Sequence, residues 1–130
     1  RVLDVTYISG DTWNVNPVAL KTIERLFCRN ERAVMRLQTE PDGEPLIIVA
    51  VAAILVASMR IRGLDEPLNL EYAGPRRMLL DRQVQRGDEL GYFEHGSTLI
   101  MFLPPAFALA PGLDTGDTIR MGRKLFMRAS

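Results

Sequence analysis

The sequence of this 130-residue chain has few of the residues that build metal sites and covalent cross-links. It contains one cysteine, Cys28, and one histidine, His95, which is too few for a disulfide framework or for a cysteine–histidine zinc site. It also lacks the glycine-rich signatures of phosphate loops and of dinucleotide-binding helices. These absences argue against a zinc enzyme, a disulfide scaffold and a nucleotide-binding domain, and we expect no metal.

An excess of charge of either sign is also missing. Sixteen basic residues balance 16 acidic ones, so no strong field favours nucleic acid as a partner. The longest uncharged apolar run, residues 46–59, is shorter than the roughly 20 residues of a membrane-spanning helix. Because valine and isoleucine favour strands, this run predicts one long buried strand or two strands across a bend.

Strand and turn signals are abundant. Segments rich in β-branched and aromatic residues alternate with short turns that contain glycine, proline or aspartate. The turn at 41–43 predicts a hairpin between residues 32–38 and the apolar run. The dipeptide Gly-Asp recurs at 10–11, 87–88 and 116–117, a weak repeat of turn-plus-strand units. The predicted strands are 2–8, 32–38, one or two within 46–59, 68–72, 78–84, one entered at 91, 97–103, 118–122 and 125–127.

One segment has a helical pattern instead. Asn16 suits an N-cap and Pro17 suits the first helical position, and the apolar residues that follow can share a face. The predicted fold is therefore mainly β: a compact β-sandwich or barrel-like domain, with one short helix near residues 17–27.

Residues 91–100, Gly-Tyr-Phe-Glu-His-Gly-Ser-Thr-Leu-Ile, suggest chemistry rather than packing. Ser97 is the candidate nucleophile, and a serine hydroxyl needs a base to activate it. Side chains two residues apart on a strand are separated by about 6.5 Å, whereas proton transfer needs about 2.6–3.2 Å. His95 is therefore a poor base unless the backbone kinks at Gly96. From these residues alone, a bend that enters a strand is the simpler interpretation.

Three ordered motifs change that interpretation. They are Tyr-Ile-x-Gly-Asp-x-Trp-x-Val-Asn-Pro at 7–17, Leu-Phe-x-Arg-Asn-Glu-Arg at 26–32, and the segment at 91–100. Together they resemble the phosphatidylserine decarboxylase proenzyme family over nearly the whole chain. The resemblance implies a pyruvoyl-dependent lyase that converts phosphatidylserine to phosphatidylethanolamine and CO₂. It implies self-cleavage between Gly96 and Ser97, so that one domain, 1–130, yields a β fragment of residues 1–96 and an α fragment of residues 97–130.

The implied chemistry starts at Ser97. Its Oγ attacks the Gly96 carbonyl carbon to form an ester, and elimination releases the upstream chain and leaves dehydroalanine, which hydrolyses to a pyruvoyl group and ammonia. The pyruvoyl carbonyl then forms a Schiff base with the substrate amine and accepts the electrons left by CO₂, the role that pyridoxal phosphate plays elsewhere. No metal or diffusible cofactor is needed.

The family's Tyr-His-x-x-His segment and upstream aspartate, which assist self-cleavage, find no match in the chain. We therefore expect a piece that is truncated on its N-terminal side and that, by itself, cleaves slowly or not at all. The alternative is a catalytically degenerate protein, or a non-catalytic β-sandwich binding module of the same fold.

The resemblance also implies substrate contacts and partners. Asn14 and Asn16 lie where the family places a loop near the substrate, although many members carry serine at the position of Asn14. The apolar segment 104–111 is either a membrane-contacting loop or an edge strand. We expect a phospholipid substrate, peripheral contact with the cytoplasmic face of the membrane, association of the α and β fragments, a homodimer, and no nucleic acid.

Overall fold

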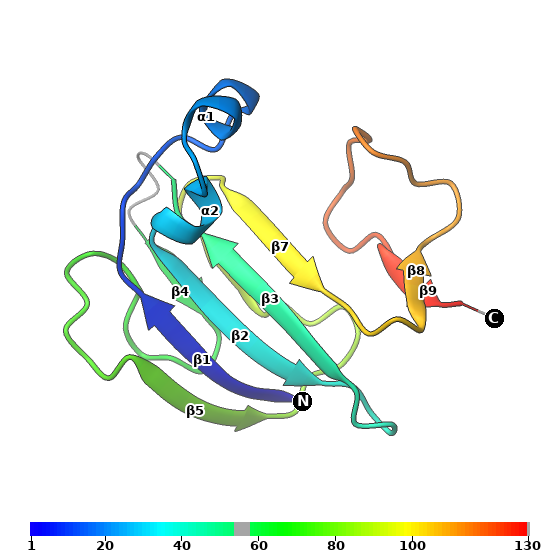
Figure 1. Ribbon diagram of the computed structural model, residues 1–130. Coiled ribbons are helices and arrows are strands. Elements are labelled where there is room, and N and C mark those ends of the chain that lie inside the picture. Colours follow the sequence, from blue (N-terminus) through cyan, green and yellow to red (C-terminus); the bar gives the residue numbers. More distant parts are fainter. Residues whose placement is uncertain (54–57, 130) are drawn as a thin grey trace.

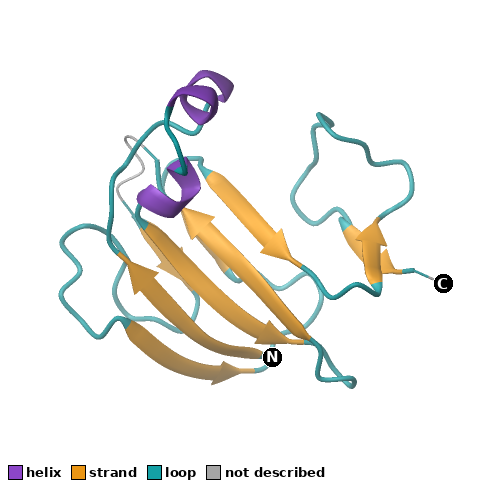
Figure 2. Cartoon of the chain, in the orientation of Figure 1, coloured by secondary structure: helices purple, strands orange, loops and turns teal. Residues whose placement is uncertain are grey.

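A computed structural model describes residues 1–53 and 58–129 and shows a mainly β fold, as the sequence predicted (Figures 1 and 2). Five strands form an antiparallel sheet, the main sheet, in the order β5-β1-β2-β3-β7. Two strand pairs, β4–β6 and β8–β9, complete the β structure. The strands of the main sheet are β1 (Val2–Ile8), β2 (Arg32–Gln38), β3 (Pro45–Val51), β5 (Arg77–Arg82) and β7 (Thr98–Phe102); the pairs are β4 (Met59–Ile61) with β6 (Gly91–Phe93) and β8 (Phe107–Leu109) with β9 (Phe126–Arg128).

The predicted hairpin is confirmed. Strands β2 and β3 pair in register from Arg32 opposite Val51 to Gln38 opposite Pro45. The apolar run 46–59 contributes to two strands, β3 in the main sheet and β4 in the second layer, and residues 54–57 between them lie outside the described residues. Strand β7 pairs with β3 and lies at the edge of the main sheet.

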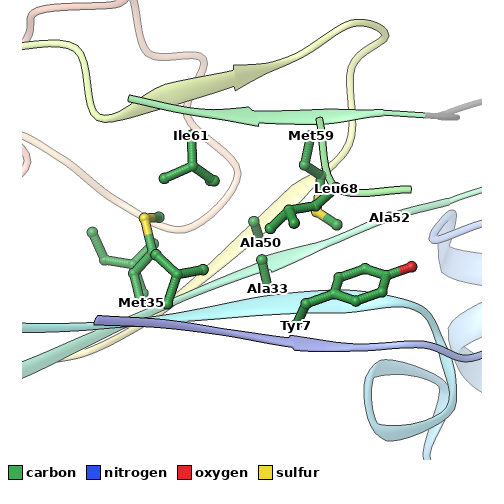
Figure 3. Packing of buried hydrophobic residues seen from close by; sticks show 10 residues of the cluster. Tyr7, Ala33, Met35, Ala50, Ala52, Met59, Ile61 and Leu68 are labelled. Atoms are coloured by element: carbon green, nitrogen blue, oxygen red, sulfur yellow. The ribbon is translucent and has the colours of Figure 1, made fainter. Parts of the chain in front are cut away.

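The core lies between the main sheet and the layer that contains β4 (Figure 3). Alternation along β1, β2 and β3 places every second side chain on this inner face, where burial of each large apolar group contributes about 1.5–3 kcal/mol. Tyr7 is the largest of the fully buried side chains and meets the ring of Tyr72 edge-on, with 5.4 Å between ring centroids. The cluster consists of Val5, Tyr7, Ala33, Met35, Ile48, Ala50, Ala52, Met59, Ile61 and Leu68.

On the outer face of the main sheet, a buried carboxylate connects three strands. Asp4 of β1 accepts hydrogen bonds from Arg36 of β2 (Nε to Oδ1, 2.8 Å) and from Arg77 of β5 (Nη2 to Oδ2, 2.7 Å). The hydrogen bond from Arg36, reinforced by the one from Arg77, lowers the pKa of Asp4 to about 2 against the opposing effect of burial.

The helical segment differs from the prediction. Instead of one helix near 17–27, the structure has two short ones, α1 (Pro17–Thr22) and α2 (Leu26–Arg29). The break has a backbone cause, because Ile23 is extended and Arg25 takes a left-handed conformation with a φ of 53°. These conformations end the helical hydrogen-bond ladder although the apolar pattern continues through the segment.

Two predicted strands are wrong. In 68–72, Leu68 forms a single bridge with Met59, and the chain then turns through a hydrogen bond from Tyr72 N to Asn69 O. In 118–122, a hydrogen bond from Arg123 N to Arg120 O closes a turn in which Gly122 has a φ of 79°. The alternating patterns of these segments therefore do not continue into a paired ladder within the described residues.

The Gly-Asp repeat is a repeat of turns. In the last two copies the glycine has positive φ, and the Asp88 and Asp117 carboxylates accept from the backbone N–H three residues earlier, at 2.7 and 2.8 Å. The first of these turns leads into β6, whereas the second leads into the turn at 120–123. The copy at Gly10 is different, because it follows β1 and approaches the backbone at Arg29.

Candidate functional site

The Gly96–Ser97 bond lies where the chain passes from β6 in the second layer to β7 in the main sheet. Strand β7 begins beside the end of β3, at the end of the sheet where α1 and α2 are found (Figure 1). The bend in this connection falls at Glu94 and His95, whereas the φ of Gly96 lies outside the left-handed region. A bend thus precedes the strand, but it lies at Glu94 and His95 and does not require an unusual backbone conformation at Gly96.

The Ser97 side chain is anchored to the end of β3. Its hydroxyl donates a hydrogen bond of 2.5 Å to the carbonyl oxygen of Val51, the residue that pairs with Thr98. The bond fixes the direction of Oγ and leaves its lone pairs free. An amide carbonyl is too weak a base to take the proton, so Val51 orients the nucleophile and does not activate it.

His95 lies on the exposed side of the connection. Within the described residues, the Ser97 hydroxyl is paired with Val51 and not with His95, as the spacing along the strand predicted. Any base that acts on Ser97 would therefore have to approach from elsewhere.

Gly96 leaves that approach open. The glycine is exposed, and a Cβ added to it would have no described atom within 4 Å. The serine hydroxyl is therefore held by Val51 and half-buried, while the glycine before it is exposed. An oriented serine hydroxyl after an exposed glycine fits the formation of a pyruvoyl group from Ser97, a step that stays a prediction.

The two predicted substrate residues have structural roles. The Asn16 Oδ1 accepts from Ala19 N at 2.8 Å, so the predicted N-cap is confirmed. The Asn14 Oδ1 accepts from Asn16 N at 2.9 Å and shapes the loop that leads into α1. Neither side chain hydrogen-bonds to Ser97 in residues 1–53 and 58–129, and their contact with a substrate stays a prediction.

A buried polar network lies at the same end of the main sheet. Asn30 is 0% exposed; its Oδ1 accepts from Trp13 N at 2.9 Å, and its Nδ2 donates to Trp13 O at 2.7 Å and to Ala52 O at 2.8 Å. Ala52 directly follows Val51, the acceptor for Ser97. The motif at 26–32 does not reveal that Asn30 bonds next to the acceptor of Ser97, because that bond reaches a strand end 22 residues away.

Glu31 belongs to this network as well. Its backbone oxygen accepts from Ala52 N at 2.8 Å, while its carboxyl oxygen lies 2.9 Å from the Tyr7 hydroxyl, which lies 2.6 Å from Asn69 O. Burial raises the pKa of Glu31, opposed by the hydrogen bond from Tyr7. A phenol has one proton and a carbonyl only accepts, so both contacts of Tyr7 are satisfied together when Glu31 is the neutral acid.

Other features of the surface do not coincide with Ser97. A hollow beside α2 is lined by Glu24, Arg25, Cys28 and Arg29, and none of the predicted site residues lines it. In the part of the chain that the structure describes, no three His, Cys, Asp or Glu side chains are grouped so as to hold a metal ion. The same part contains no helix that is long and apolar enough to cross a membrane.

Comparison with known proteins identifies the family. A family model described as phosphatidylserine decarboxylase matches residues 1–127. The chain belongs to the phosphatidylserine decarboxylase family. The family predicted from the three motifs is thereby confirmed.

Curated relatives agree with this assignment. Phosphatidylserine decarboxylase proenzymes from Chromobacterium violaceum and Anaeromyxobacter sp. strain K are 31% and 40% identical to the chain, and each alignment covers 96% of it. The proenzyme from Shewanella frigidimarina is 35% identical over 92% of the chain. These alignments cover 46%, 45% and 43% of the relatives, so the chain spans just under half of their length. No solved structure matches the chain significantly.

Proposed function

We propose that the protein to which this chain belongs is a pyruvoyl-dependent lyase that decarboxylates the serine headgroup of phosphatidylserine. The observation that carries the proposal is the geometry at Ser97, whose hydroxyl is held by Val51 directly after the exposed residue Gly96. The relatives' names as decarboxylase proenzymes support both the reaction and a maturation step.

In this proposal, Ser97 first acts on its own chain. The Ser97 Oγ forms a bond to the Gly96 carbonyl carbon, and the Gly96–Ser97 amide breaks as the ester forms. Elimination across Cα–Cβ of residue 97 then releases the upstream segment as a carboxylate. Hydrolysis of the resulting enamine releases ammonia and leaves the pyruvoyl group, which supplies an electron sink for decarboxylation when substrate is bound. The proton of Ser97 goes to a base that residues 1–53 and 58–129 do not place beside it.

The main sheet would keep the two fragments together after cleavage. Strand β7, in the proposed α fragment, pairs with β3 from Ile47 opposite Phe102 to Val51 opposite Thr98. Arg128 of β9 also reaches Asp42 and Glu44 in the turn between β2 and β3, at 2.5 Å each. A break at Gly96 thus leaves the new terminus next to the end of β3.

We also propose a peripheral location at the cytoplasmic face of a membrane and assembly as a homodimer. The exposed apolar side chains of the C-terminal region, which includes Leu109 of β8 and Met121, are consistent with contact with lipid or with a second copy. Segment 104–111 contains strand β8, so its predicted strand is present, while its contact with a membrane stays a proposal.

The test uses the full-length product of the gene and compares Ser97→Ala with Ser9→Ala, which changes an exposed serine at the same end of the main sheet. We expect Ser97→Ala to abolish both self-cleavage and CO₂ release from phosphatidylserine vesicles, and Ser9→Ala to retain both. Decarboxylation by the Ser97→Ala protein would refute the pyruvoyl assignment. Wild-type protein that releases no CO₂ would favour the degenerate enzyme or the binding module.

A further inference from the structure

Asn30 connects the loop that carries two predicted substrate residues to the strand end that holds the Ser97 hydroxyl. The loop is 13–16, which contains Asn14 and Asn16, and the strand end is at Val51 and Ala52. The Asn30 side chain bonds to both backbone groups of Trp13 and to the carbonyl of Ala52, with no exposed surface.

The chemistry of the partners fixes the orientation of this amide. Trp13 N is a donor, so it must face the Asn30 Oδ1, whereas Trp13 O and Ala52 O only accept and must face the two Nδ2 protons. The side chain thus uses its oxygen and both N–H bonds, and each bond goes to backbone. Aspartate has the same shape but offers no donor in its ionised form, so it cannot make two of these three bonds.

The surrounding backbone confirms how closely the segments approach. Asp11 N donates to Arg29 O at 2.8 Å, and Glu31 N donates to Asp11 O at 2.7 Å. Ala52 N donates to Glu31 O at 2.8 Å on the other side. The connection between α2 and β2, residues 29–31, therefore lies between the 11–13 segment and the end of β3. The Asn30 side chain bonds to both of these neighbours.

We propose that Asn30 is a positioning residue, which holds the 13–16 loop in a fixed place relative to the β3 carbonyl that orients Ser97. The proposal rests on the function proposed above. If the loop contacts substrate, Asn30 sets the distance between the substrate contacts and the residue that carries the chemistry. Loss of the Asn30 side chain affects Ser97 through Ala52, which directly follows the acceptor Val51. It affects the loop through Trp13, which directly precedes Asn14.

The structure also supplies a direct probe of this role. Trp13 is the only tryptophan of the 130 residues, and both of its backbone groups bond to Asn30. Release of the loop changes the environment of its indole ring. Acrylamide quenching of the fluorescence that is lost in a Trp13→Phe background therefore reports the position of the loop without any need for activity.

The experiment compares Asn30→Asp with Tyr7→Phe in the full-length gene product. Tyr7→Phe is matched, because it removes polar contacts of a buried side chain in the same region, and the Tyr7 hydroxyl bonds to Glu31 and Asn69 rather than to Trp13 or Ala52. Three properties are measured: the rate of Gly96–Ser97 cleavage by mass spectrometry, KM and kcat of the cleaved fraction, and quenching of Trp13. The melting temperature of each protein is recorded alongside.

We expect Asn30→Asp to slow cleavage by about tenfold or more, to raise KM more than it lowers kcat, and to increase quenching of Trp13. Tyr7→Phe at a similar loss of melting temperature leaves the quenching and KM near wild type. Equal effects of the two variants would overturn the positioning role, as would unchanged cleavage and quenching in Asn30→Asp. If Asn30→Asp does not fold, Asn30→Ser, which keeps one donor, replaces it and must change all three properties in the same directions by smaller amounts. Wild-type values of all three properties in Asn30→Ser would overturn the proposal. Wild-type protein that never cleaves at Gly96 would instead refute the proposed function.

Discussion

Different kinds of contact stabilise the Ser97 end of the main sheet and the C-terminal hairpin region, residues 104–129. At the Ser97 end, side chains such as Asn30 and Glu31 are buried, and each bonds to a segment distant in sequence. In the C-terminal region, β8 and β9 pair mainly with each other, and the turn between them exposes Met121 to 93%. Long-range polar bonds thus define the position of the site, whereas the hairpin region depends on local turns and surface ion pairs.

This difference predicts which substitutions change the geometry of the site. Buried hydrogen-bonded groups are costly to leave unpaired, about 1–3 kcal/mol each, whereas exposed ion pairs contribute about 0–1 kcal/mol. We therefore expect substitutions of similar size to have unequal effects in the two regions.

Gly10→Ala should have the largest effect on stability. A Cβ at this position would lie 2.2 Å from the Arg29 carbonyl oxygen, a backbone atom that cannot move aside alone. We expect a loss of about 2–4 kcal/mol in the free energy of unfolding, measured by denaturant titration. Gly96→Ala is the control, since its Cβ meets open space and its backbone is not left-handed, and it should cost within about 0.5 kcal/mol. Equal costs for the two would show that the close approach at Gly10 is not rigid.

Glu31→Gln should change how stability depends on pH. Burial raises the pKa of Glu31, so its favourable contribution is complete below the ordinary pKa of about 4.3 and is lost as pH rises toward the raised value. Glutamine cannot ionise, so the variant should lose less stability than wild type as pH rises above about 4.3, and its melting temperature should exceed that of wild type at the upper end of the titration.

The acid side provides an internal control for this titration. The pKa of Asp4 is lowered to about 2, so its stabilisation is present above its ordinary pKa and is lost as pH falls from about 4 toward 2. Both proteins should share this loss. A Glu31→Gln protein whose melting temperature falls as steeply as that of wild type when pH rises above about 4.3 would show that Glu31 does not titrate with folding.

Arg128→Ala should have the smallest global effect. Its side chain is about half exposed, and its ion pairs with Asp42 and Glu44 lie at the surface, so we expect a loss below about 1 kcal/mol. The local effect should be greater, because these pairs connect β9 to the turn between β2 and β3. Limited proteolysis should cut residues 104–129 faster than in wild type. Arg62→Ala, which breaks the exposed pair with Glu89, is the control that should leave this cleavage unchanged.

The same contrast explains what could be predicted from the sequence. Strands 2–8 and 32–38 were predicted with the observed bounds because their alternation matches a half-buried sheet, and Asn16 was recognised as a cap from local chemistry alone. Residues 118–122 have a similar alternation but turn instead, since a strand needs a partner and none of the described segments pairs with them. Pattern predicts what a segment can form, and pairing decides what it does form.

The site shows the same limit. The motif predicts Ser97 and Gly96 as site residues, which stays a prediction, and the spacing along the strand predicted that His95 would not pair with the Ser97 hydroxyl. The bond from Ser97 to Val51 could not, because it joins residues 46 apart that meet only when β7 joins the edge of the main sheet. The hydrogen bond from Asn30 to Ala52 could not be predicted from the sequence for the same reason.

Intact mass spectrometry of the full-length gene product tests the central claim most directly. The account predicts two chains divided between Gly96 and Ser97, with the second chain lighter by one ammonia than a hydrolytic product that begins with serine. It also predicts that the two chains co-purify through the β3–β7 ladder and separate in denaturant. A single uncleaved chain, or a second chain that begins with an unmodified serine, would contradict it.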